Sequence, residues 1–281
     1  MDVAIGLPST VPGTSGDRLL EWARRAEARG FSSLGTIDRI VYDNYEPLLA
    51  LAAAAAVTKR IGLCTSVLLG PLRSNHAELA KQALSLNAIS GGRFTLGIAL
   101  GGREDDYEVS GVEFRGRGKR FDRELQRIKE IWEGGEVGPS AAPPPRLVVG
   151  GHAEASFKRA ARFGEGWIAG GAAPEEYAAM LGKVKAAWGE AGREGEPRAM
   201  GLAYFGLGEN AVAEAREELT GYYAWLGEEI AGYIADSAAT DAETVKQYLS
   251  AFEGAGCQEL ILFPTSSDPA QVDLLADAAG L

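Results

Sequence analysis

The chain has few of the residues that usually build metal and redox centres. Among its 281 residues are two cysteines, two histidines and three methionines. Cys64 and Cys257 stand far apart, in or beside apolar runs, and their spacing is not that of a metal site. We therefore expect two buried thiols. A zinc site built from histidine and cysteine is close to excluded.

The chain also lacks an excess of basic residues and any long hydrophobic run. Its formal net charge of -11 argues against binding to nucleic acid, which needs clustered lysine and arginine. No stretch has the length of a membrane span, and Met1 and Asp2 lead directly into a predicted strand without a signal sequence. These features predict a cytoplasmic protein with neither nucleic-acid nor membrane partners.

Short β-type runs alternate with longer segments of helical periodicity along the whole chain. The predicted strands cover residues 3–7, 33–37, 61–68, 94–99, 146–149, 167–169, 199–207 and 259–263. Eight such units, with strands that are apolar throughout, predict an α/β fold in which a parallel sheet closes into a (β/α)₈ TIM barrel. An open, doubly wound sheet usually has a glycine fingerprint after its first strand, and residues 6–10 do not form one.

Two insertions interrupt the regular spacing of one expected domain, residues 1–281. Residues 133–145, which include three consecutive prolines, precede the fifth strand, and residues 210–235 form a helical insertion after the seventh. The aromatic residues of the second insertion are expected to pack helices together rather than to form a ligand cage; they are Tyr222, Tyr223, Trp225 and Tyr233.

Helix ends can also be predicted. The first helix should end near Gly30, and Thr240 with Glu243 has the spacing of a capping box. Asp268, Pro269 and Gln271 have the pattern of a helix start.

Glycine follows half of the predicted strands, at the end of a barrel where active sites lie. Three strands are followed by a glycine pair, namely Gly101-Gly102, Gly150-Gly151 and Gly170-Gly171, and a fourth is followed by the single Gly206. Backbone without side chains lets a flat or phosphorylated ligand approach closely, although a turn without a ligand explains any one pair equally well. After Gly151 a helix is expected to begin at once, near residues 152–156, and free amide groups at a helix start suit a phosphate.

Several polar side chains at the same end are candidates for chemistry. Asp38 could act as a base or form a turn, and Arg39 could contact an anionic substrate or pair with Asp38. His76 could transfer protons or simply cap a helix, and Tyr107 could reach over a bound ring.

Several segments together resemble the bacterial-luciferase-like flavin monooxygenases and their deazaflavin-dependent relatives. The resemblance spans almost the whole chain, and its segments are EWARRAEARGF, RIGLCTSVLLGPLR, LAKQALSLNAISGGRFTLGIALGG, GRGKRFDRELQRIKEIW, VVGG with AARFGEGW, and AFEGAGCQELILFP. Their order and spacing carry the resemblance more than any single motif.

The resemblance implies a barrel that holds reduced FMN or the 8-hydroxy-5-deazaflavin coenzyme. The phosphate of the cofactor would contact Gly151, His152, Ala153 and Ser156. The ring would lie against the end of the third strand, where Ser66 and Val67 would be joined by a non-prolyl cis peptide, with Gly101 and Gly150 beside it. Independently of the resemblance, their positions near the strand ends make Asp38 and His76 the catalytic candidates and place Arg39 and Tyr107 near the substrate.

The resemblance further implies a monooxygenase that uses O₂ on a small organic substrate, with a separate flavin reductase and a homodimeric assembly. Two alternatives stay open: hydride transfer with a deazaflavin, and a non-catalytic flavin-binding protein. The chain departs from bacterial luciferase at two places. Luciferase has a phosphate-binding arginine where this chain has Leu100, and the catalytic histidine of luciferase has no equivalent beside Asp38 and Arg39.

Overall fold

A computed structural model describes residues 1–281. Its strands are β1 (Asp2–Gly6), β2 (Ser33–Thr36), β3 (Gly62–Thr65), β4 (Leu68–Leu69), β5 (Phe94–Ala99), β6 (Arg146–Gly150), β7 (Gly166–Gly171), β8 (Arg198–Phe205) and β9 (Glu259–Pro264). All neighbouring strands are parallel, and pairing of β3 with β5 closes the sheet. Since β3 and β4 are two parts of one barrel strand, the predicted (β/α)₈ barrel is confirmed.

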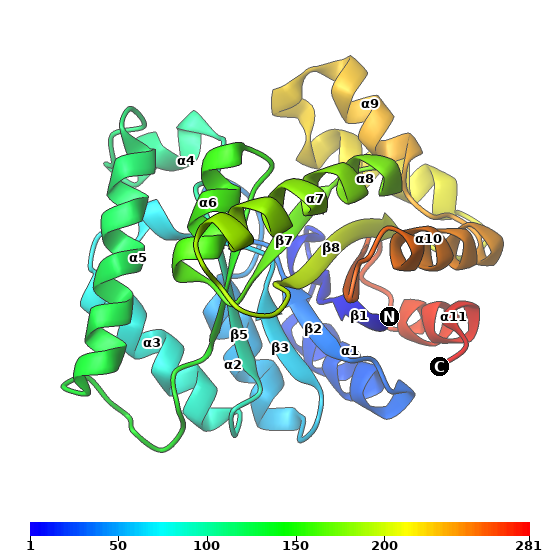
Figure 1. Ribbon diagram of the computed structural model, residues 1–281. Helices are drawn as coiled ribbons and strands as arrows, with labels where there is room; N and C mark the ends of the chain where they lie inside the picture. The colour runs from blue at the N-terminus through cyan, green and yellow to red at the C-terminus, as the bar shows by residue number, and fades with distance from the viewer.

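The helices form an outer ring around the strands (Figure 1). They are α1 (Gly16–Arg29), α2 (Pro47–Val57), α3 (His76–Ile89), α4 (Glu104–Val109), α5 (Arg117–Gly134), α6 (Glu154–Phe163), α7 (Pro174–Glu190), α8 (Ala211–Tyr222), α9 (Glu228–Asp236), α10 (Ala242–Gly254) and α11 (Ala270–Ala279). Three 3₁₀ turns accompany them: η1 (Pro8–Thr10), η2 (Gly70–Leu72) and η3 (Ala224–Leu226).

The strands are apolar on both faces because each contributes to two layers of core. The larger layer lies between strands and helices and includes Trp22 and Trp167, both fully buried. The smaller layer includes Phe263 inside the barrel and extends to residues of α8 and α9. A side chain at Gly6 would place its Cβ 2.2 Å from the Phe263 ring, and one at Gly35 would lie 2.9 Å from it. Glycine in β1 and β2 therefore makes room for the aromatic ring that fills the barrel.

The ends of the helices test the sequence predictions individually. Helix α1 ends at Gly30, which has a left-handed φ of 88°, as predicted. The prediction of a capping box formed by Thr240 and Glu243 is wrong. The N-cap residue is Asp241, one position later, and its carboxylate accepts the Thr244 amide at 2.8 Å.

The start of the last helix is predicted in part. Asp268 accepts the amide of Ala270 at 3.0 Å. Gln271 instead uses its side-chain amide to bind both backbone groups of Leu207, at 2.8 and 2.6 Å. This contact ties α11 to the chain that leaves β8.

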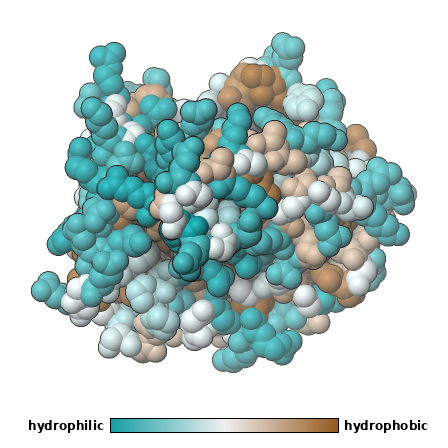
Figure 2. All heavy atoms as spheres, in the orientation of Figure 1, coloured by the Kyte–Doolittle hydropathy of each residue, from teal (hydrophilic) through white to brown (hydrophobic).

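Both predicted insertions are present. Residues 135–145 contain neither helix nor strand, and α8, η3 and α9 occupy the second insertion. Figure 1 shows α4 and α9 on the same side of the barrel, the upper side of the view. Figure 2 shows a mostly hydrophilic face with a hydrophobic patch over the α9 region, where Ile230 is 49% exposed.

The first and last helices close the outer ring. Arg25 and Arg29 of α1 pair with Asp273 of α11 at 3.0 and 3.1 Å, and Figure 1 shows the two chain ends beside α11. Both cysteines are buried and unpaired, as expected. No helix has the length and apolar character that crossing a membrane would require.

Candidate functional site

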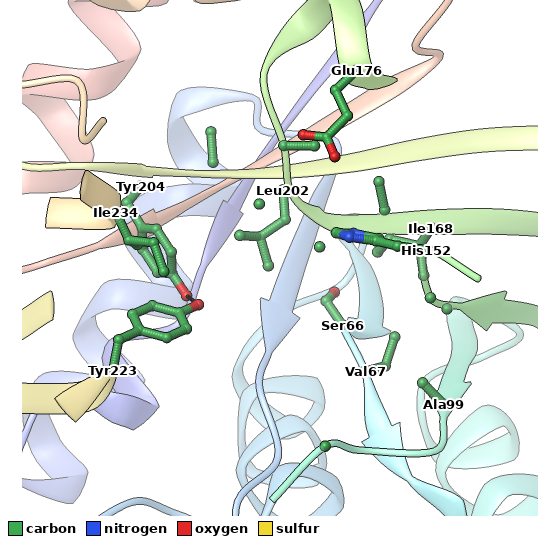
Figure 3. Close-up of a pocket in the computed structure, with 18 of the residues that line it drawn as sticks. Ser66, Val67, Ala99, His152, Ile168, Glu176, Leu202, Tyr204, Tyr223 and Ile234 are labelled. Carbon is green, nitrogen blue, oxygen red and sulfur yellow. Dashed lines mark hydrogen bonds between the residues drawn. The ribbon is translucent and has the colours of Figure 1, made fainter. Parts of the chain in front are cut away.

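A cavity of about 750 Å³ opens at the carboxyl ends of the strands, between the barrel and the insertion of α8, η3 and α9. Such a volume is typical of sites for cofactors and small molecules. Seven of the sequence-predicted cofactor residues line it: Ser66, Val67, Gly101, Gly150, Gly151, His152 and Ser156. Figure 3 shows several of them around the open centre.

Glycine backbone forms part of the cavity wall. A Cβ on Gly150 would lie 2.9 Å from Cγ1 of Val67 and 3.2 Å from Cβ of Ala99. Gly101 has a left-handed φ of 73°, which favours glycine. A ligand can therefore lie directly against main chain at the ends of β5 and β6.

Gly151 allows α6 to start immediately beside the cavity. Its φ is 130°, and an added Cβ would lie 2.5 Å from Oγ of Ser156. The N-cap residue of α6, Ala153, has no side chain that could accept the first amides. The first turn of this helix thus keeps unsatisfied N–H groups, as helix starts do in the absence of a cap.

The third barrel strand is interrupted at the cavity. The Ser66-Val67 peptide bond is cis, as the resemblance implied, and it lies between β3 and β4. Both residues line the cavity. The interruption divides one strand into two short segments that both pair with β5.

His152 and Glu176 stand together at the rim, as Figure 3 shows. The imidazole packs against Gly170, where a Cβ would lie 3.4 Å from Nε2. Partial burial lowers the pKa of His152, and the Glu176 carboxylate opposes that effect. The histidine is therefore mainly neutral at pH 7. No lysine or arginine lines the cavity.

The far wall of the cavity is aromatic. Tyr223, Trp225 and Tyr233 line it, although Tyr223 also packs edge-on against Tyr222, as the expectation of aromatic packing predicted. Tyr222 follows that expectation, since its ring packs edge-on against Tyr42 at 4.9 Å. Tyr204 also lines the cavity, but nothing in the sequence of β8 distinguishes it from the other buried residues of that strand.

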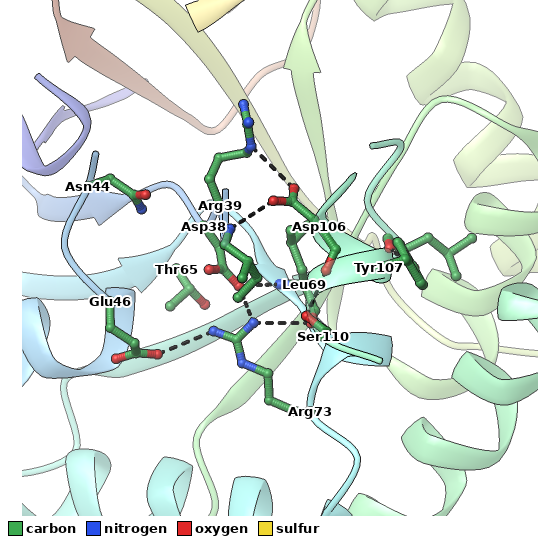
Figure 4. Close-up of polar contacts among 12 residues, drawn as sticks. Asp38, Arg39, Asn44, Glu46, Thr65, Leu69, Arg73, Asp106, Tyr107 and Ser110 are labelled. Atoms are coloured by element: carbon green, nitrogen blue, oxygen red, sulfur yellow. Dashed lines mark hydrogen bonds and ion pairs between the residues drawn. The ribbon is translucent and has the colours of Figure 1, made fainter. Parts of the chain in front are cut away.

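Asp38 lies beneath the cavity wall and does not line the cavity. Its Oδ2 accepts the Leu69 amide at 2.8 Å and lies 2.6 Å from Nη1 of Arg73 (Figure 4). Burial raises the pKa of Asp38, whereas Arg73 and the Leu69 amide lower it. Through these contacts, Asp38 supports β4 directly behind the cis peptide.

Arg39 and Tyr107 also point away from the cavity. Arg39 pairs with Asp106 of α4 at 3.2 Å (Figure 4). The fully buried Tyr107 donates its hydroxyl to the carbonyl of Leu100, and burial raises its pKa to about 12. The expectation that Tyr107 reaches over a ring is therefore wrong for this structure.

His76 occupies the first position of α3, after the N-cap residue Asn75. It lies outside the cavity lining, as does Ala153. A catalytic role for Asp38 or His76 stays a prediction, but neither side chain reaches the cavity. No group of three or more His, Cys, Asp or Glu side chains is placed to hold a metal ion.

Comparison with known families adds to this geometry. The family model of luciferase-like monooxygenases matches residues 1–272. The chain belongs to this family. Because the members of this family are oxidoreductases, the chain is an oxidoreductase.

Curated relatives and solved structures agree with the luciferase-like assignment. An uncharacterized protein of Mycobacterium tuberculosis is 34% identical over 207 residues, covering 61% of this chain and 71% of that protein. An F420-dependent glucose-6-phosphate dehydrogenase of Amycolatopsis mediterranei is 29% identical over 175 residues, covering 53% of this chain and 52% of that enzyme.

Two solved structures share the luciferase-like fold across nearly the whole chain. The monooxygenase RslO1 from Streptomyces bottropensis superposes with a TM-score of 0.81 at 22% identity, covering 99% of this chain and 98% of its own. An F420-dependent secondary alcohol dehydrogenase, solved with an F420-acetone adduct, gives 0.82 at 19% identity with the same coverage. At these identities the likeness concerns the fold alone.

Proposed function

We propose that this chain is a flavin-dependent monooxygenase that binds reduced FMN in the cavity and uses O₂ to oxygenate a small organic substrate. The observation that carries the proposal is a cavity of about 750 Å³ whose wall is glycine backbone and whose edge is the uncapped start of α6. These two features match the two parts of the cofactor, a flat ring and a phosphate.

The residues around α6 fit a phosphate. The N-cap residue Ala153 leaves the amides of the first turn without a side-chain acceptor, and the Ser156 hydroxyl lies on the same side. Helix starts of this kind bind anions through amide groups and the helix dipole. Gly151 permits the close approach, and His152 closes the edge. The proposed phosphate contacts are therefore Gly151, His152, Ala153 and Ser156.

The residues beyond the phosphate fit a planar ring. The wall of Ser66, Val67, Gly101 and Gly150 offers backbone at close range, and Leu202 and Ile168 offer apolar surface. Reduced FMN, when bound, supplies the electrons that activate O₂. The chain would orient the ring and limit the access of water, since Trp225 and Leu226 of the insertion add apolar side chains to the cavity lining.

The charge of the cavity favours FMN over the deazaflavin coenzyme. The tail of the deazaflavin carries carboxylates in addition to its phosphate. No lysine or arginine lines the cavity, and Glu176 stands at its rim. A tail with one anionic group therefore fits this wall better than a tail with several.

Hydride transfer with a deazaflavin is the second candidate. The sequence match to the F420-dependent dehydrogenase of Amycolatopsis mediterranei supports it. The match covers 53% of this chain and 52% of that enzyme.

The proposed reaction needs further partners. We expect a separate flavin reductase, because the first strand ends at Gly6 and continues as Leu7-Pro8-Ser9-Thr10, which is not a nicotinamide-binding fingerprint. We also expect a homodimer, as the family resemblance implies.

Parallel titrations test the choice of cofactor. The purified chain is titrated anaerobically with reduced FMN and with the reduced deazaflavin coenzyme, and bound cofactor is followed by absorbance and fluorescence. We expect tighter binding of FMN and an O₂-dependent spectral change in its complex. Tighter binding of the deazaflavin would favour the second candidate, and binding of neither would refute both.

A further inference from the structure

Two tyrosine hydroxyls meet on the cavity wall that faces His152 across the open centre. Tyr204 comes from the end of β8 and Tyr223 from the turn after α8, and their hydroxyl oxygens lie 2.6 Å apart. Figure 3 shows this pair on one side of the cavity and Val67 and His152 on the other. The barrel and the insertion thus contribute one hydroxyl each to a single polar point.

This pair has one hydroxyl proton more than it uses. Each tyrosine can donate one proton, and the bond between them occupies one of the two. Neither hydroxyl contacts another acceptor of the chain. Burial raises the pKa of both Tyr204 and Tyr223, so both keep their protons at neutral pH. One O–H group is left to donate to a molecule in the cavity.

The wall around the pair is apolar and carries no positive charge. Figure 3 shows Ile234 beside the pair and Leu202 between the pair and His152, and Leu226 and Phe252 also line the cavity. No lysine or arginine lines any part of it, and the only carboxylate in the lining belongs to Glu176. A phosphate or carboxylate on a substrate would lose its water here without gaining a cationic partner, which is costly.

We propose that the Tyr204–Tyr223 pair binds an uncharged oxygen of the substrate and that the cavity rejects anionic substrates. The substrate class is therefore a largely apolar ketone, aldehyde or alcohol without a phosphate or carboxylate. Tyr223 donates to the substrate oxygen, and Tyr204 orients Tyr223 through the hydrogen bond between them. This inference rests on the proposed function, since it assumes that a substrate enters the same cavity as the cofactor.

Binding measurements with matched probes test the inference without turnover. The probes are 2-octanone and 7-oxooctanoate, which share a ketone and differ by one carboxylate. Each is titrated by calorimetry into the wild type loaded with oxidised FMN, and into the Tyr223→Phe, Tyr204→Phe and Tyr177→Phe variants. Tyr177 is a matched control, because its hydroxyl is buried without a hydrogen-bond partner and does not line the cavity.

We expect the wild type to bind 2-octanone at least about tenfold more tightly than 7-oxooctanoate. Loss of one hydrogen bond in Tyr223→Phe should weaken 2-octanone about three- to tenfold. Tyr204→Phe should have a smaller effect and Tyr177→Phe none. Equal binding of the two probes, no binding of 2-octanone, or an unchanged affinity in Tyr223→Phe would overturn the inference.

The affinity of each variant for FMN separates this inference from the proposed function. If every variant binds FMN as the wild type does and the ketone affinity does not respond to Tyr223, only the inference fails. If the wild type binds no FMN, the proposed function fails. The ketone titrations are then made with the unloaded chain, and they decide the inference by the same criteria.

Discussion

Asp106 holds Arg39 and two backbone amides at the same time. Its Oδ2 lies 3.2 Å from Nε of Arg39, and its Oδ1 accepts the amides of Ile40 and Val41 at 3.0 and 2.7 Å. Figure 4 shows the carboxylate directed at the loop that follows β2. The guanidinium of Arg39 in turn lies 5.2 Å from the ring centre of Tyr222 in α8. One carboxylate thereby links α4, the β2 loop and the insertion.

Replacing Asp106 should destabilise the protein strongly. The Asp106→Asn substitution can retain an amide contact but leaves Arg39, which is 8% exposed, without its counter-ion. Breaking a buried ion pair by removing one partner typically costs about 3–5 kcal/mol. We expect a loss of this size in the free energy of unfolding measured with urea.

A surface pair provides the control for this prediction. Asp236 pairs with Arg216 at 2.7 Å, but both side chains are largely exposed. Asp236→Asn should not change the unfolding free energy measurably, because exposed pairs contribute little. Equal losses in the two variants would show that burial of the Arg39–Asp106 pair is not what makes it matter.

Adding one methyl group at Gly151 should disrupt cofactor binding. In Gly151→Ala the new Cβ would lie 2.5 Å from Oγ of Ser156, at a φ of 130° that alanine rarely adopts. The start of α6 must then move away from the cavity. We expect the affinity for FMN, measured by fluorescence quenching, to fall by roughly tenfold or more, as for the loss of a hydrogen bond to a charged group.

Gly182→Ala serves as the matched variant. Gly182 lies within α7 and a Cβ there meets no atom within 4 Å. Alanine favours a helix by about 1 kcal/mol over glycine, so this variant should bind FMN normally and be slightly more stable. Normal FMN binding by Gly151→Ala as well would argue against a phosphate at the start of α6.

The role of Ser156 can be separated from that of the ring. Ser156→Ala removes a hydroxyl donor while it keeps the helix and its amides. We expect the affinity for FMN to fall roughly tenfold and the affinity for riboflavin, which lacks the phosphate, to stay unchanged. Ser85→Ala in α3, where the hydroxyl bonds the carbonyl of Lys81, should alter neither affinity. Equal losses for FMN and riboflavin would place Ser156 at the ring instead.

Glu124 should make stability depend on pH. This residue of α5 is 1% exposed, and neither of its carboxylate oxygens has a hydrogen-bond partner. Burial raises its pKa from 4.5 to about 8, although Arg73 opposes the shift. The folded chain therefore keeps a proton here that the unfolded chain releases between those two pH values, and stability falls as pH rises through that window.

The Glu124→Gln variant does not titrate at this position. Its unfolding free energy should rise relative to that of the wild type between pH 5 and about 8, by up to about 1.4 kcal/mol for each pH unit. Urea unfolding at pH 5, 6, 7 and 8 measures the difference. A constant difference over this range would mean that Glu124 is ionised throughout.

The sequence was sufficient for the barrel and for the glycine wall. All eight barrel strands lie where the apolar runs predict them, because strands buried on both faces leave a clear pattern. The glycine pairs at the carboxyl ends of β5, β6 and β7 line the cavity as expected, since parallel strands end at the same rim.

Side-chain direction at the rim could not be read from the sequence. Asp38 and Tyr107 both follow barrel strands, yet one binds Arg73 behind β4 and the other bonds the carbonyl of Leu100. The direction of each depends on partners distant in sequence. Tyr223 was expected to pack helices and also lines the cavity. Helical periodicity shows which face of a helix is buried, but it does not show whether that face covers a core or a cavity.

The structure of a complex with FMN tests the central claim most directly. Crystals of the chain, soaked with oxidised FMN, should show the phosphate within hydrogen-bond distance of the Ser156 hydroxyl and the first amides of α6. One face of the ring should lie along Ser66, Val67 and Gly150, and the opposite face should be directed toward Tyr223. A phosphate bound away from Gly151 and α6, or a ring outside the cavity, would contradict the account.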